Sequence, residues 1–241
     1  MEVAQIVAVT IGALVASILS AVAGMGGAVV LLPILVWTFG VQEAIPVLTV
    51  AQLIGNASRV WFNRSELSLP VVRWFAIGAV PAAILGSVIF ANAPAGALVR
   101  ILGAFLLLII VYRHSPWGKQ EHISLRGFLP VGGASGVISA LVGFSGPFMA
   151  PFFLMYGLVK GEFIGTESLA TLVIHGTKLG AYGSYNLLGM RSILAGIAIG
   201  AVMIVGSFVG KRILARLPER FFPYLIEALI LAAGLLFVIR G

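Results

Sequence analysis

The fold is decided by the stretch Ala23-Gly24-Met25-Gly26-Gly27-Ala28, which interrupts one apolar run with glycines and then begins another. A similar stretch, Val142-Gly143-Phe144-Ser145-Gly146-Pro147, does the same in the second half of the chain. Backbone groups released from a helix inside hydrocarbon have no water to bind, so such breaks persist only where they line a cavity or pack against protein. Two breaks in matching positions of two halves are the pattern of a transporter binding site.

The composition places the chain in a membrane. Its 241 residues are 60% hydrophobic and only 10% charged, whereas soluble domains contain about 25% charged residues. The sequence contains neither cysteine nor aspartate, which excludes thiolate sites and argues against a metal centre. No GxxxxGK[ST], HExxH or GxSxG motif occurs, so we expect neither enzyme activity nor a cofactor. The net charge of +7 indicates the positive-inside bias of membrane proteins, not nucleic-acid binding.

The apolar runs predict an all-α, polytopic integral membrane protein of one membrane domain. A spanning helix needs about 20 apolar residues, and the runs at 28–39 and 147–158 are shorter. Each short run follows a glycine break, so each half is expected to combine a re-entrant or discontinuous helix pair with three spanning helices. The first run, Val3–Ala23, is expected to be a retained helix rather than a signal peptide, because it lacks a basic start.

The two halves are related by a constant offset of 119 positions, which joins Gly24 to Gly143. Polar pairs that share one offset inside apolar helices indicate a duplication. The chain therefore divides into a first transmembrane repeat at 1–114, a cytoplasmic linker at 115–125 and a second repeat at 126–241. The same offset joins Gly27 to Gly146, Glu43 to Glu162, Asn56 to His175 and Arg59 to Lys178.

The lysines and arginines predict the topology. If the loop at 63–70 is cytoplasmic and each glycine hairpin enters and leaves on one side, most basic residues fall in the cytoplasm. Both termini would then face outward, and the two repeats would be inverted relative to each other. The alternative counts each broken segment as one crossing, which gives parallel halves of four spans. The residues expected outside are Arg100, Arg191 and Arg240.

The residues around each break are expected to form an anion site. Glycine lets the backbone approach a ligand, and Pro147 suits the first position of a helix. Helix N-termini offer unpaired N–H groups and a partial positive charge, which favour an anion. The alternative is that the glycines serve only close helix packing. The candidate residues at the two breaks are Gly24, Gly26, Gly27, Ala28, Gly143, Ser145 and Gly146.

The third apolar run of each half adds polar side chains that share one helix face, because they are spaced by four and three residues. Polar groups inside a bilayer are costly and usually face the protein interior or a cavity. Amide, imidazole and cationic donors suit an oxyanion. The alternatives are interhelical hydrogen bonds for the amide and imidazole, and interfacial positions for the two cations. The candidates are Gln52, Asn56, Arg59, Thr171, His175 and Lys178.

Two residues of the second half are candidates for coupling anion movement to a proton. His175 changes charge near neutral pH, and Glu167 lies on the same expected helix. A monoanion leaving a cell that is negative inside gains about 2.3 kcal/mol per 100 mV. Export would therefore run as a uniporter, whereas uptake would require a coupled proton or other cation. The sequence leaves the oligomeric state open.

The duplicated layout resembles the TauE/SafE family of sulfite exporter-like membrane proteins. The residues that carry the resemblance are Gly24-Met25-Gly26-Gly27 with Pro33, and Gly143-Phe144-Ser145-Gly146 with Pro151. The chain departs from a pattern with a third glycine, since Ala28 and Pro147 follow the two breaks. The resemblance implies a multi-pass permease of the inner cell membrane that moves sulfite, organosulfonates or related small anions outward.

We therefore expect a secondary transporter for small sulfur-containing anions, working by alternating access around a site near the middle of the membrane. Its partners would be membrane lipid and the anion, without nucleic acid or a metal. Two alternatives remain at this point. An anion channel would use the same residues, and a non-transporting membrane scaffold or accessory subunit would use the glycines for packing alone.

Overall fold

The computed structural model describes residues 2–24, 27–94 and 122–218. Gly26, the apolar runs at 97–112 and 221–239 and most of the expected linker lie outside the described residues. Every regular element in the described part is helical, as the apolar runs predict. The helices are α1 (Val3–Ala23), α2 (Gly27–Phe39), α3 (Val41–Phe62), η1 (Arg64–Glu66), α4 (Leu69–Asn92), η3 (Leu125–Gly127), α6 (Phe128–Val142), α7 (Gly146–Met155), α8 (Lys160–Ser184) and α9 (Met190–Arg216).

Four stretches of the described chain are long and apolar enough to cross a membrane: α1, α4, η3 with α6, and α9. Their outer faces carry large apolar side chains that stay exposed, such as Ile11 on α1, Leu85 on α4 and Val205 on α9. An apolar exterior of this extent fits contact with lipid rather than water. α3 and α8 have comparable lengths, but their mean hydropathy is lowered by polar side chains that the bundle buries.

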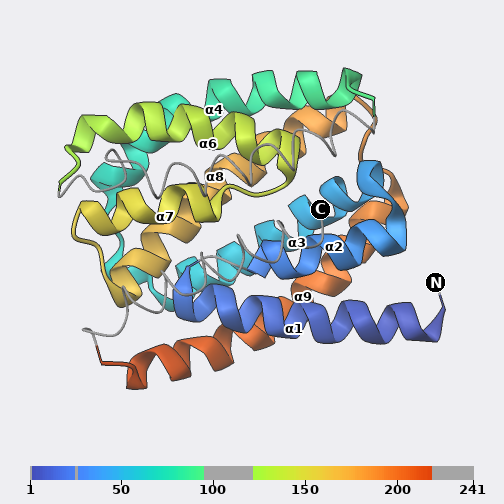
Figure 1. Ribbon diagram of the computed structural model, residues 1–241, viewed down its shortest axis with the longest axis horizontal. Helices are drawn as coiled ribbons and strands as arrows, with labels where there is room; N and C mark the ends of the chain where they lie inside the picture. The colour runs from blue at the N-terminus through green and yellow to red at the C-terminus, as the bar shows by residue number, and fades with distance from the viewer. Residues whose placement is uncertain (1, 25–26, 95–121, 219–241) are drawn as a thin grey trace, which may run out of the picture.

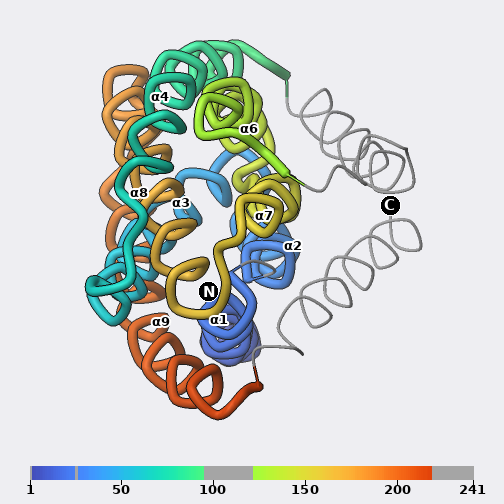
Figure 2. Tube along the Cα trace, turned by 90° about the vertical axis from the view of Figure 1, so that its left-hand side faces the viewer, coloured from blue at the N-terminus to red at the C-terminus, as the bar shows by residue number. Residues whose placement is uncertain are grey.

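The helices form a bundle in which α1 packs against α9, the last helix that the structure describes. Figures 1 and 2 show α4 beside α6 on one side and α1 beside α9 on the opposite side, with α2, α3, α7 and α8 between them. α3 also packs against α9, and α4 against α8, while α3 and α8 meet at the centre. This arrangement places the two polar helices in the interior, away from the outer apolar faces.

Both glycine breaks end a helix in the left-handed conformation. Gly24 has φ 74° and donates its N–H to the Ser20 carbonyl at 2.8 Å, which caps α1. Gly143 has φ 96° and donates to the Ser139 carbonyl at 2.9 Å, which caps α6. Residues with a side chain rarely adopt the left-handed backbone conformation, which accounts for glycine at both positions. After each cap the chain turns, and the short helices α2 and α7 run back alongside α1 and α6 (Figure 1).

The contact between α4 and α6 depends on glycines that let the two backbones meet. A Cβ atom on Gly132 of α6 would collide with the Phe75 carbonyl oxygen of α4, and one on Gly78 would collide with the Leu129 carbonyl oxygen. Close approach through small residues is a main source of helix association in membranes. The neighbouring Gly133 is different, because its added Cβ would lie 3.9 Å from the nearest atom, the Gly78 carbonyl oxygen.

We therefore predict that Gly132→Ala lowers the free energy of unfolding by about 1–3 kcal/mol, the usual cost of overpacking. Gly133→Ala, one position along the same helix, is the matched control and is expected to keep stability or to gain up to about 1 kcal/mol, because its added Cβ has room. Thermal unfolding of the two purified variants in detergent measures the difference. Equal unfolding temperatures would show that the α4–α6 contact does not need the small residue at position 132.

Candidate anion site

A buried cavity lies where the two glycine breaks meet α3 and α8. It has a volume of about 30 Å³ and receives residues from five helices. Its polar lining comes mainly from α3 and α8, and its glycines come from the ends of α1, α2 and α7. The residues that line it are Ser20, Gly24, Gly27, Ala28, Gln52, Asn56, Arg59, Phe144, Ser145, Gly146, Pro147, Glu167, Thr171 and His175.

Arg59 is the cation of this cavity, and only 2% of its surface is exposed. Its Nε donates to the Ser168 hydroxyl at 3.0 Å, and its Nη2 donates to the Asn56 amide oxygen at 2.6 Å. The third nitrogen, Nη1, is buried and finds no acceptor among the residues that the structure describes. Two bonds thus fix the guanidinium plane and leave one charged donor nitrogen without an acceptor among the described residues, a type of donor that suits an anion.

The α3 residues that share a face by sequence spacing also share this cavity. The Asn56 side-chain amide donates to the Gln52 backbone carbonyl at 2.7 Å and lies 3.5 Å from the Gln52 side-chain oxygen. The side-chain oxygen of Asn56 in turn accepts a hydrogen bond from Nη2 of Arg59. The row Gln52–Asn56–Arg59 therefore orients the guanidinium from within α3, without a carboxylate bonded to it.

The α8 side of the cavity contains an acid and an imidazole. One oxygen of Glu167 accepts a hydrogen bond from the Thr171 hydroxyl at 3.0 Å. The other oxygen, Oε2, and Nδ1 of His175 are both buried and without a hydrogen-bond partner in the described part of the chain. Unsatisfied polar atoms are rare in protein interiors, so their grouping around one cavity points to a ligand that completes them.

The starts of two helices face the same cavity. α2 begins with Gly27 and Ala28, and α7 begins with Gly146 and Pro147, all of which line it. In α7, Pro147 has no N–H and Phe148 donates to the Ser145 carbonyl at 3.0 Å, so this start favours an anion mainly through the positive end of the helix dipole. The start of α2 presents the same end of its dipole. The Ser145 hydroxyl lines the cavity but donates to the Met149 sulfur at 3.1 Å.

Three candidates from the sequence lie elsewhere or are not described. Lys178 is fully buried one turn beyond His175, and its ammonium group donates to the Ser139 carbonyl at 2.7 Å rather than lining the cavity. Gly143 caps α6 and packs near Leu48. Gly26 lies outside the described residues.

Other cavity residues were not among the candidates for anion binding. Ser20 lies one helical turn before Gly24, so a hydroxyl that close to the break was a usable signal. Phe144 follows Gly143 directly, and it gave no polar signal. Glu167 stood only as a candidate proton carrier, because a carboxylate does not suggest an anion site. Pro147 stood only as a helix start.

These observations define an integral membrane protein with a polar cavity at the centre of an apolar helical bundle. A sequence model of the family described as Sulfite exporter TauE/SafE matches residues 9–237. The chain belongs to this family, which confirms the resemblance read from the glycine motifs. Membership implies an exporter-type membrane permease for sulfite or a related sulfur anion, and the family comprises transporters rather than enzymes. Searches of curated proteins and of solved structures gave no match.

Proposed function

We propose that the protein is a secondary transporter that binds a small sulfur oxyanion, sulfite or an organosulfonate, in the cavity beside Arg59. The observation that carries this proposal is the Nη1 of Arg59, which has no acceptor in the described part of the chain, at a cavity bounded by two helix starts. A cation held by neutral partners, together with oriented N–H groups, recognises an anion without a buried counter-charge bonded to it. The proposed binding residues are the sequence candidates that line the cavity, namely Gly24, Gly27, Ala28, Gln52, Asn56, Arg59, Ser145, Gly146, Thr171 and His175. Lys178 lies outside the cavity lining and supports the site through its bond to the Ser139 carbonyl.

Alternating access between inverted repeats is part of this proposal. The elements follow one order in both halves, since α2 and α7 begin at Gly27 and Gly146, and α3 and α8 at Val41 and Lys160. α1 packs on α9 as α6 packs on α4, and the two short helices return from opposite ends of the bundle (Figure 1). The cavity holds roughly one water-sized sphere, so its walls must part for an oxyanion to enter.

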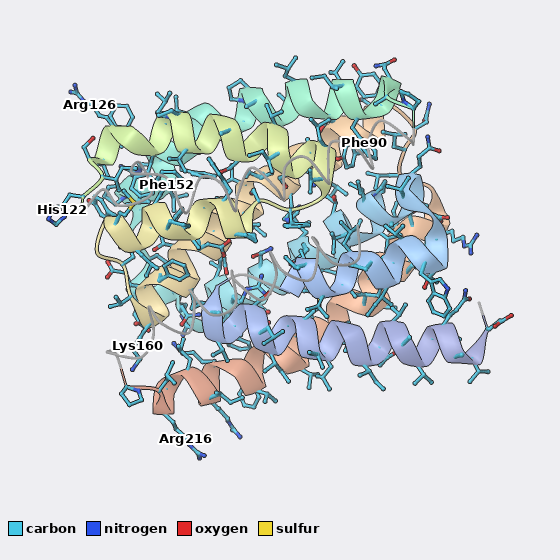
Figure 3. The ribbon with its side chains drawn as sticks, viewed as in Figure 1. Phe90, His122, Arg126, Phe152, Lys160 and Arg216 are labelled. Atoms are coloured by element: carbon cyan, nitrogen blue, oxygen red, sulfur yellow. The ribbon has the colours of Figure 1, made fainter. Side chains whose placement is uncertain are left out.

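The proposed orientation follows the basic side chains. Arg126, Lys160 and Arg216 all lie at one end of the bundle, on the left in Figure 3. The start of α1 and the start of α9 lie at the opposite end (Figure 1), and Arg191 belongs to the first turn of α9. By the positive-inside rule, the end that carries Arg126, Lys160 and Arg216 faces the cytoplasm, and the protein lies in the inner cell membrane. In this proposed orientation the chain crosses the membrane several times, and the cavity lies between the cytoplasm and the outside.

Flux in proteoliposomes tests the proposal. We expect saturable exchange of labelled sulfite that is competed by methanesulfonate and little affected by acetate, because membership of the family implies a sulfur anion as substrate. Carrier-like turnover with countertransport distinguishes it from an anion channel, which would conduct far faster and show no countertransport. Folded protein that moves none of these anions would contradict the proposal and favour the accessory-subunit alternative.

A further inference from the structure

We propose that each anion crosses together with one proton carried on Glu167, an inference that rests on the proposed anion site. Glu167 is 3% exposed and lines the same cavity as Arg59, with which it interacts electrostatically. No hydrogen bond or ion pair within 4.0 Å joins the two side chains in the described structure, so the carboxylate balances the guanidinium only across the cavity.

The charge balance of the cavity carries the inference. Arg59 and an ionised Glu167 together are neutral, which is the arrangement that a buried site tolerates when no ligand is bound. A bound anion next to an ionised Glu167 would leave a net negative charge in a medium of low dielectric constant, which is costly. Protonation of Glu167 removes that charge, so anion and proton stabilise each other's binding.

The geometry of Glu167 allows it to hold the proton. Thr171 donates to Oε1, while Oε2 has no hydrogen-bond partner in the described chain. A proton on Oε2 turns this atom into a donor, for which an oxyanion bound in the same cavity would be an acceptor. When the anion leaves, the proton leaves with it and the carboxylate again faces Arg59.

Three other titratable groups lie in or near the described cavity, and the test below separates Glu167 from them. From α3 only Arg59 faces the cavity, and α1, α2 and α7 contribute no titratable side chain to the lining that the structure describes. On α8, His175 also lines it. Lys178 is bonded to the Ser139 carbonyl in the last turn of α6, where the helix dipole already stabilises a cation.

The test compares the charge moved per anion in wild type and Glu167→Gln. A glutamine is neutral without a proton, so removing the carboxyl adds one negative elementary charge to each transport cycle, whichever anion is used. Labelled sulfite is equilibrated across proteoliposomes at equal pH on both sides and at a series of potassium diffusion potentials. Accumulation changes about tenfold for every 60 mV per elementary charge moved.

We expect Glu167→Gln to give a slope steeper than wild type by one elementary charge. Glu162→Gln, at the start of the same helix and outside this cavity, is the matched control and should keep the wild-type slope. If the glutamine variant binds sulfite without moving it, proton uptake on binding in lightly buffered detergent decides the question. The variant is then expected to take up one proton fewer per anion than wild type.

Equal slopes, or equal proton uptake, in wild type and Glu167→Gln would overturn the inference while leaving the anion site standing. A folded wild-type protein that neither binds nor moves sulfite would overturn the proposed function, and the proton coupling with it. The two failures are therefore distinguishable in the same set of measurements.

Discussion

Arg59→Gln is expected to weaken sulfite transport about 10- to 100-fold, measured as the apparent affinity in proteoliposomes. A hydrogen bond to a charged group contributes about 1.5–3 kcal/mol, and each 1.4 kcal/mol is a factor of ten in affinity. Arg59 supplies the one cationic donor that lines the described cavity, and its Nη1 has no other acceptor there. Removing it takes away both the charge and the donor.

Two further variants separate the cavity from general effects of charge. Arg59→Lys keeps the charge but carries its three donors on a single nitrogen, so it cannot reproduce the planar set of bonds that Arg59 makes with Asn56 and Ser168, and an intermediate loss is expected. Arg64→Gln is the control, because Arg64 is an exposed cation of η1 that donates to the Trp61 carbonyl. Wild-type affinity in a folded Arg59→Gln protein would remove Arg59 from the binding site.

Gly27→Ala is expected to reduce sulfite flux at least about tenfold and to destabilise the protein by about 1–3 kcal/mol. An added Cβ would collide with the Ser20 hydroxyl and with the Ala16 backbone carbonyl of α1. A hydroxyl can rotate away, but a helix carbonyl cannot, so the start of α2 must move. Gly27 and Ser20 both line the cavity, and the displacement therefore changes its shape.

A glycine on a neighbouring helix provides the control for this variant. Gly176 lies on α8 with open space around its added Cβ, so Gly176→Ala is expected to keep flux and to gain up to about 1 kcal/mol of helix stability. Flux and thermal unfolding are measured on both proteins. A Gly27→Ala variant with wild-type flux and unfolding temperature would show that the first break tolerates a side chain.

Much of this fold follows from the sequence because apolar runs and glycines act locally. The break at Gly24 predicts the end of α1, and the sequence boundary Val3–Ala23 coincides with the helix. The three-and-four spacing predicts the shared face of Gln52, Asn56 and Arg59, and all three line one cavity. The sequence offset of 119 positions also matches the starts of α2 and α7.

Tertiary contacts account for what the sequence could not predict. Lys178 has the spacing of a cavity residue, but a long side chain reaches as far as its partners allow, and here its partner is the Ser139 carbonyl on another helix. Glu167 lies on a helix whose sequence does not reveal that Arg59 faces it across the cavity. Pairing between α1 and α9, and between α4 and α6, likewise depends on long-range packing that periodicity does not encode.

The most direct test of the proposed site is a structure of the full chain with bound selenite, an oxyanion close to sulfite in shape that anomalous scattering can locate. We predict selenite in the cavity between Arg59 Nη1 and the starts of α2 and α7. Selenite bound instead beside Lys160 and Lys211, in the larger cavity of about 390 Å³, or no site at concentrations that compete sulfite flux, would contradict the assignment.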